Sequence, residues 1–266
     1  MGNTKKIIKL GLKIWSPDTD SIEEAFKLYR EKMYDYVELY VVPGSFDTTI
    51  DYWKRLHIPY IIHCAHSFHG FNLAHNVNRQ KNKEIFEEVK NFADVLSAAI
   101  IIVHGGNDGP IEETIFQLNG LQDIRLAIEN KPYWALNSKK CIGYSPEEIL
   151  RIKKAVNPLK FVLDFGHAIY ASNSLRVNAS TFIESFLKLS PDVFHLGDGD
   201  IRAEKDCHKN FNRGTFDIGE LMSFVPDGSY LTIETPREEE NGLNDFVADM
   251  AFLWRMLSQR KTVKIQ

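Results

Sequence analysis

The 266-residue chain has few cysteines, no long apolar segment and no large excess of charge of either sign. Its three cysteines are an odd number without a CxxC pair, so a disulfide framework is not expected and a reducing, cytoplasmic location fits. The sequence has no apolar run of about 18 residues, which predicts no membrane-spanning helix. A net charge of −4 gives no support to a strongly basic surface for nucleic acid, although a local basic patch is compatible with it.

Nucleotide-binding signatures, internal repeats and low-complexity tracts are also missing. No GxGxxG or GxxxxGK[ST] sequence follows a strand-like segment, which disfavours a doubly wound nucleotide-binding fold. No linker divides the chain, so we expect one domain that spans residues 1–266. A hydrophobic fraction of 44% and a charged fraction of 26% are typical of a globular enzyme.

Six successive strand-like segments each end on a side chain that can bind a metal ion. The end residues, in chain order, are His63, His104, Glu129, Asp164, His195 and Glu234. In an open sheet, strands about 4.8 Å apart would spread six such ends over roughly 24 Å. A closed parallel barrel instead gathers them around one mouth, where α/β barrels carry their active sites. The pattern therefore predicts a barrel with a metal site at its C-terminal face.

Strand-like and helix-like segments alternate along the whole chain. Strands are expected at 7–14, 36–40, 58–63, 99–104, 125–129, 160–164, 193–196 and 230–234. Helices are expected after Asp20 or Ser21, at 49–56, 78–97 and 111–118, after Ser145, and at 181–189, 218–224 and 243–258. Ser21 and Glu24 have the spacing of a capping box. Eight strands alternating with eight helices predict an α/β fold, a single (β/α)8 TIM barrel.

Two short spacings add candidate ligands to the strand ends. In LDFGH, Asp164 and His167 are three residues apart, so a turn after the strand can direct both into the mouth. In DCH, Asp206 and His208 are two apart and would point the same way from an extended loop. Mixed imidazole and carboxylate ligands suit Zn, Mn, Fe or Co better than Ca or Mg. The expected cofactor is a divalent transition metal, with one to three ions per chain.

The chain resembles the xylose-isomerase-like TIM barrels, a superfamily of sugar isomerases and epimerases and of apurinic-site nucleases of the endonuclease IV type. The motifs that carry the resemblance are HCAHSFHGFNLAH, VHGGND, LAIEN, VLDFGHA, FHLGDGD, DCHKNFNRGTFDIGEL and LTIETP, in this order. The resemblance implies a metal common to both branches, held by Glu129, Asp164, His195 and Glu234. It implies two further metals for the endonuclease branch: one at His63 and His104 with Glu129 bridging, the other at His167, Asp206 and His208.

The sequence departs from the endonuclease pattern in its first half and in its loops. His66 stands where the nuclease has a tyrosine, and GLKIWS and YVELY resemble the sugar-isomerase branch. The loops NDGPIEET and TPREEEN are acidic, whereas a phosphate backbone attracts lysine and arginine. These departures favour a small sugar or sugar phosphate over nucleic acid as the partner.

The preferred hypothesis is a metal-dependent isomerase or epimerase of a sugar or sugar-like substrate, phosphorylated or not. Glu129 and Glu234 would move the carbon-bound proton, with His167 holding substrate hydroxyls. Expected substrate contacts are Arg202, Arg213, His66 and Trp15. The alternative is phosphoester hydrolysis by two or three metals, as an apurinic-site endonuclease or on a small substrate. A non-catalytic barrel is disfavoured because every ligand position is filled, and the sequence does not indicate an oligomeric state.

Overall fold

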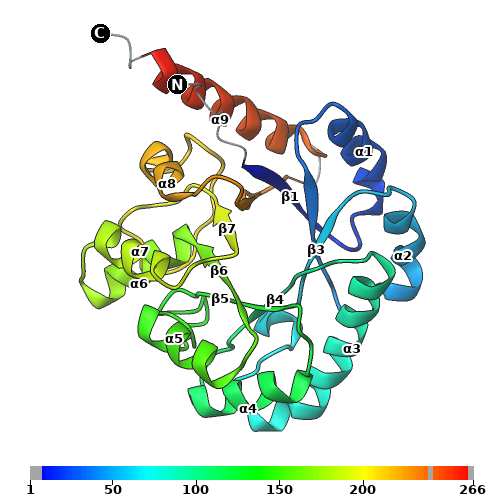
Figure 1. Ribbon diagram of the computed structural model, residues 1–266, viewed down its shortest axis with the longest axis vertical. Helices are drawn as coiled ribbons and strands as arrows, with labels where there is room; N and C mark the ends of the chain where they lie inside the picture. Colours follow the sequence, from blue (N-terminus) through cyan, green and yellow to red (C-terminus); the bar gives the residue numbers. More distant parts are fainter. Residues whose placement is uncertain (1–7, 239–241, 263–266) are drawn as a thin grey trace.

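The computed structural model describes residues 8–238 and 242–262, and its eight parallel strands close into one barrel (Figure 1). The strands pair in chain order, and β8 returns to pair with β1. Their bounds are β1 Lys9–Trp15, β2 Tyr36–Tyr40, β3 Tyr60–His63, β4 Ile101–His104, β5 Leu126–Glu129, β6 Lys160–Asp164, β7 Val193–Leu196 and β8 Tyr230–Ile233. The predicted (β/α)8 barrel is confirmed; Ile7, which the sequence assigns to the first strand, lies outside the described residues.

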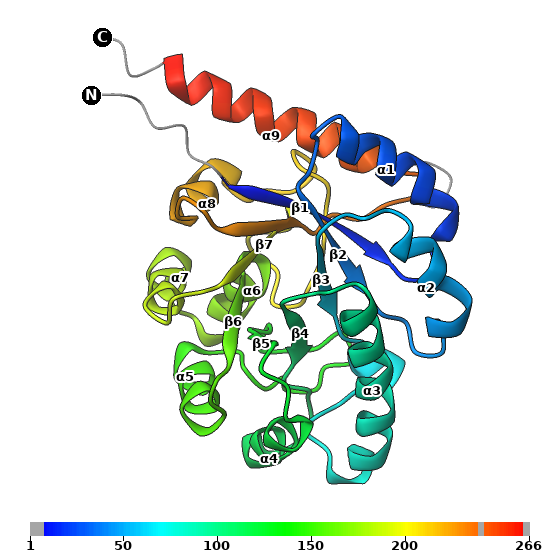
Figure 2. The same ribbon diagram turned by 45° about the vertical axis from the view of Figure 1, so that its right-hand side comes forward.

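Helices lie outside the strands around the barrel, as Figures 1 and 2 show from two directions. They are α1 Ile22–Arg30, α2 Phe46–Lys54, α3 Arg79–Val95, α4 Ile111–Leu121, α5 Pro146–Ala155, α6 Phe165–Leu175, α7 Ala179–Leu187, α8 Ile218–Phe224 and α9 Asn244–Thr262. Short 3-10 turns at Ser67–His69 and Asn76–Asn78 shape the loop between β3 and α3. None of the helices in the described ranges is long and apolar enough to cross a membrane.

The barrel interior is built in layers, because residues two apart on a strand face the same side. One layer is apolar and contains Tyr36, Ile61, Ile102, Ala127, Val162 and Val193, with Tyr230 packed against it. On β1 this layer is completed by Gly11, where a Cβ atom would overlap the ring of Tyr36. Two residues further along each strand lies a polar layer: Lys13, Glu38, His63, His104, Glu129, Asp164, His195 and Thr232.

Two local features differ from the sequence-based expectation. Helix α6 begins directly after β6, where no helix is expected, and the expected helix at 181–189 is α7. The capping box at Ser21 does not form, since Ser21 has helical backbone angles and makes no side-chain cap. The Glu24 carboxylate instead accepts a hydrogen bond from the backbone N–H of Leu243, before α9.

Candidate metal centre

The nine predicted ligands come together at the C-terminal mouth of the barrel in overlapping groups. In each group the potential ligand atoms lie within 4.8 Å of one another. The groups are His63, His104 and Glu129; Glu129, Asp164 and His167; Asp164, His195 and Glu234; and His167, Asp206 and His208. Strand register accounts for part of this, because His104 pairs with Glu129 and Asp164 with His195 across neighbouring strands.

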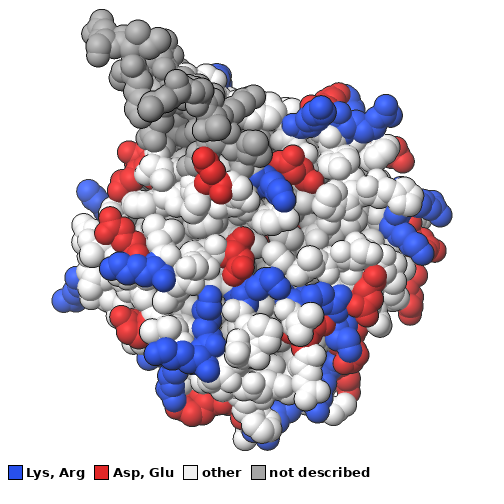
Figure 3. Space-filling model, viewed as in Figure 1, with Lys and Arg blue, Asp and Glu red and all other residues white. Residues whose placement is uncertain are grey.

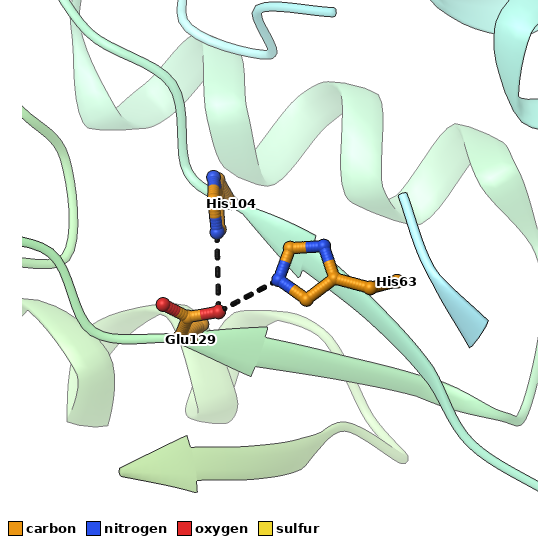
Figure 4. A group of neighbouring side chains, drawn as sticks. All are labelled: His63, His104 and Glu129. Atoms are coloured by element: carbon orange, nitrogen blue, oxygen red, sulfur yellow. Dashed lines mark hydrogen bonds and ion pairs between the residues drawn. The ribbon is translucent and has the colours of Figure 1, made fainter. Parts of the chain in front are cut away.

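The first group joins β3, β4 and β5 through one carboxylate oxygen (Figure 4). Oε2 of Glu129 lies 3.0 Å from Nε2 of His63 and 3.1 Å from Nε2 of His104. Nδ1 of His63 is 2.9 Å from the carbonyl oxygen of Cys64, which fixes its proton on Nδ1. The Nε2 of a neutral His63 then directs a lone pair at a carboxylate lone pair. A proton or a metal ion between the two atoms is what makes this contact favourable.

His195 is the centre of the second arrangement. Its Nε2–H donates to Oε2 of Glu38 at 2.9 Å, so Nδ1 is the ring nitrogen that can offer a lone pair to a metal ion. Nδ1 lies 2.9 Å from Oε2 of Glu234, 3.6 Å from Oε2 of Glu129 and 3.9 Å from Oδ2 of Asp164. Nδ1 and the Glu234 oxygen are both buried, and neither finds a hydrogen-bond partner among the described residues. One imidazole nitrogen facing three carboxylates fits a divalent cation.

The loop ligands form the third arrangement. Oδ2 of Asp206 lies 3.3 Å from Nε2 of His167 and 3.1 Å from Nε2 of His208. The other ring nitrogen of each histidine faces a backbone carbonyl: Nδ1 of His167 is 2.9 Å from Asn130 O, and Nδ1 of His208 is 3.2 Å from Glu234 O. Both rings are therefore oriented by the main chain, with Nε2 directed at Asp206.

Charge shifts the pKa values of these groups in opposite directions. Burial raises the pKa of Glu234, but Lys13 and His195 lower it, and the balance lies well below the ordinary value. Burial lowers the pKa of His195, whereas Glu38, Glu129 and Glu234 raise it well above the ordinary value. His167 follows the same pattern, since burial lowers its pKa, Asp164 raises it and Lys131 lowers it, to a balance of about 10. Such histidines hold a positive charge where a bound metal ion would otherwise supply it.

Three residues of the mouth were missed by the sequence analysis. Nζ of Lys13 lies 2.7 Å from Oε1 of Glu234 and 3.2 Å from Oε1 of Glu38. Lys131 follows β5, and its Nζ lies 3.2 Å from Nε2 of His167 and 3.8 Å from Oε1 of Glu129. The two-residue period of a strand could have identified Lys13 and Glu38. Lys13 lies two residues after Gly11, and Glu38 lies two residues after Tyr36, so both side chains face the barrel interior.

The predicted substrate contacts fall in two places. His66 lies beside the mouth, with its ring parallel to that of His104 at 6.2 Å between centroids. Trp15 is 43% exposed at the end of β1, and its ring packs on Tyr40, which also contacts His66. Arg202 and Arg213 are exposed on the loop between β7 and α8. The substrate roles of these four residues remain predictions.

Comparison with known proteins gives the same fold. An uncharacterized protein of Methanocaldococcus jannaschii, MJ1614, is 24% identical over 215 residues, or 74% of this chain and 79% of that protein. A D-tagatose 3-epimerase-like protein superposes with a TM-score of 0.73 at 19% identity, covering 96% of this chain and 99% of that one. Endonuclease IV from Thermus thermophilus gives 0.66 at 18% identity, covering 93% and 99%. At these identities the two structures show a shared fold.

A sequence model of one family matches most of the chain. The model describes the xylose isomerase-like TIM barrel, and the match runs over residues 26–256. It includes all nine candidate ligands and spans β2 to β8. The protein therefore belongs to the family of xylose isomerase-like TIM barrels.

Proposed function

We propose that the protein is a divalent-metal-dependent isomerase or epimerase acting on a sugar or sugar-like substrate, phosphorylated or not. The proposal depends above all on the placement of Glu129 and Glu234, whose Oε2 atoms lie 3.6 and 2.9 Å from the same nitrogen, Nδ1 of His195. Two carboxylates that reach one cation site from β5 and from the end of β8 can remove a carbon-bound proton and return it. Family membership and the epimerase-like neighbour support this choice.

The residues of the mouth would have different roles in such a reaction. An ion held by Glu129, Asp164, His195 and Glu234 would polarise the substrate carbonyl and stabilise the negative charge that develops on its oxygens. Glu129 and Glu234 act as base and acid. Lys13 holds Oε1 of Glu234 at 2.7 Å, which keeps Oε2 directed at His195. His167, which is anchored through Nδ1, holds a substrate hydroxyl.

A small substrate fits the surroundings of the mouth. The rings of Trp15, Tyr40 and His66 form an aromatic wall that can pack on the carbon skeleton of a sugar. On the face drawn in Figure 3, lysine and arginine side chains are interspersed with aspartate and glutamate. A duplex backbone would favour a continuous basic surface. Arg202 and Arg213 are the residues on the β7–α8 loop that could meet a substrate phosphate.

Proton exchange in D2O tests this function across many sugars at once. Wild-type protein loaded with Mn²⁺, Co²⁺ or Zn²⁺ is incubated with a panel of ketoses, aldoses and their phosphates, and deuterium beside the carbonyl is measured by NMR. Glu234→Gln should abolish exchange, because it removes a ligand charge and a proton acceptor. Glu204→Gln, an exposed change on the β7–α8 loop, should retain it. Full exchange by metal-loaded Glu234→Gln would exclude Glu234 from proton transfer.

Hydrolysis of a phosphoester is the second candidate, and the complete set of nine ligands favours it. Two or three ions would supply hydroxide and stabilise the attacked phosphate and the leaving oxygen. The same preparations can be assayed with a phosphodiester and analysed for metal content. Hydrolysis by protein that holds two or three ions per chain, without deuterium exchange in any sugar, would replace the isomerase with this second function.

A further inference from the structure

Lys131 places an ammonium group at the nitrogen that a metal ion in the loop site would need. Its Nζ lies 3.2 Å from Nε2 of His167, and the side chain is 16% exposed. Lys131 comes two residues after Glu129, so its side chain enters the mouth beside that ligand, 3.8 Å from Oε1. Among the described residues, no other lysine or arginine forms a hydrogen bond or ion pair with His167, Asp206 or His208.

The ring of His167 has only one nitrogen to offer. Nδ1 lies 2.9 Å from the carbonyl oxygen of Asn130 and 3.0 Å from Oε1 of Glu129, so it carries a proton and donates. Nε2 has a single lone pair, which a proton, an N–H of Lys131 or a metal ion can occupy, one at a time. Charge also opposes metal binding at this nitrogen. The ammonium group of Lys131, a few ångströms away, would strongly repel a divalent ion in the half-buried mouth.

We propose that Lys131 is a built-in competitor for the metal ion of the His167–Asp206–His208 site. This inference rests on the proposed metal centre and specifies how that centre is filled. Among the residues that the structure describes, no lysine forms a hydrogen bond with a ring nitrogen of His63, His104 or His195, so we expect those sites to fill first. The loop site fills only when Lys131 leaves His167. In the metal-free protein the ammonium group of Lys131 adds a positive charge beside His167, which suits an isomerase rather than a hydrolase that needs all three ions.

Metal binding to the full-length protein tests the competition directly. Wild type, Lys131→Met and Lys131→Gln are equilibrated with Zn²⁺ or Co²⁺ at buffered free concentrations, and bound metal is counted by mass spectrometry. Both variants should bind the last ion on the order of tenfold more tightly, since they lose a like charge that lies 3.2 Å from the ligating nitrogen. Lys139→Met removes an exposed lysine of the same loop and should match wild type. Adding His208→Ala to Lys131→Met should abolish the gain.

The outcomes separate this inference from the proposed function. Wild-type protein that binds ions, with the last affinity unchanged in both Lys131 variants, would overturn the competition and leave the metal centre in place. A gain of the same size in Lys139→Met, or one that survives His208→Ala, would also overturn it, because the effect would then lie elsewhere. Wild-type protein that binds no ion under any of these conditions would overturn both.

Discussion

At the scale of single residues, Glu38 decides which nitrogen of His195 is available. Its Oε2 accepts hydrogen bonds from His195 at 2.9 Å and from the Thr232 hydroxyl at 2.6 Å, and all three groups are fully buried. Burial raises the pKa of Glu38, but His195 and Lys13 lower it to about 2, so the carboxylate stays ionised. A fixed carboxylate that accepts a hydrogen bond from a metal-binding imidazole sets the tautomer of the imidazole and increases the basicity of its other nitrogen.

Removing the hydrogen bond from His195 to Glu38 should weaken metal binding, although every candidate ligand stays in place. Glu38→Leu should lower the affinity for the first Zn²⁺ by about 10- to 100-fold, because His195 loses the partner that keeps its lone pair on Nδ1. Glu38→Gln, which can still accept the hydrogen bond, should lose less. Competition with a chromophoric chelator measures both, with exposed Glu23→Gln as the control. Equal affinity in wild type and Glu38→Leu would show that His195 needs no such partner.

The sequence indicated which strand-end residues lie at the mouth better than it indicated the charged residues around them, for a physical reason. A histidine or an acid at the end of a strand is visible as a break in an apolar run, as at His63 and Asp164. Lys13 and Glu38 lie inside their strands, where a single polar residue reads equally well as facing solvent. Only barrel closure, which makes alternate positions of β1 and β2 interior, shows that these charges meet Glu234 and His195.

At the scale of elements, helix α6 shows why a local sequence pattern can fail to predict a helix. Its sequence FGHAIYASNSL is buried on most sides, so it lacks the amphipathic period by which helices are recognised. Its N-cap is Asp164, whose carboxylate accepts from the backbone N–H of His167 at 2.6 Å. The residue that ends β6 as a proposed metal ligand thus also starts the helix, with no loop between them to mark the boundary.

The loop that carries His66 is fixed by buried amides from two helices. Asn82 of α3 is fully buried; its Nδ2 donates to the carbonyl of Asn72 at 2.8 Å and to Gln117 of α4 at 2.7 Å, while its Oδ1 accepts from Asn72 N at 3.0 Å. Asn72 in turn donates to the carbonyl of Asn107 after β4 at 3.0 Å. The loop after β3 is therefore held in place by α3, α4 and the loop after β4.

Replacing Asn82 by leucine should cost about 2–4 kcal/mol of unfolding free energy. The change leaves the N–H of Asn72 and Oε1 of Gln117 buried without partners and removes the shorter hydrogen bond to the Asn72 carbonyl. Each orphaned group costs about 1–3 kcal/mol, partly relieved by relaxation. Urea denaturation measures the effect, and Asn91→Leu on the exposed side of the same helix is the matched control. Equal midpoints for wild type and Asn82→Leu would mean that the amides do not hold the loop.

At the scale of the whole molecule, the apolar layer of the barrel interior stabilises the fold, whereas the polar layer at the mouth carries the candidate metal ligands. Below the mouth, the layer of Tyr36, Ile61, Ile102 and Val162 is apolar and closely packed. At the mouth, Lys13 pairs with Glu38 and Glu234, and Lys131 with Glu129, whereas Asp164 and Asp206 pair with histidines. Without a bound cation, protonated His167 and His195 offset part of this negative charge. Burial and the neighbouring Glu234 and Glu129 still raise the pKa of Asp164, so this carboxylate should destabilise the metal-free fold.

Replacing Asp164 tests whether a carboxylate that binds the metal ion also destabilises the metal-free fold. Asn at position 164 keeps the shape and the helix cap of α6 but removes one buried negative charge, so the metal-free Asp164→Asn protein should melt a few degrees above metal-free wild type. Saturating Zn²⁺ should stabilise wild type by about 2.7 kcal/mol at 100 times the Kd, and Asp164→Asn much less, because it binds the ion weakly. Thermal melts in EDTA and in Zn²⁺ measure both shifts, with exposed Asp51→Asn as the control. If Asp164→Asn instead melts below wild type in EDTA and gains as much from Zn²⁺, then Asp164 stabilises the fold and contributes no charge to the metal centre.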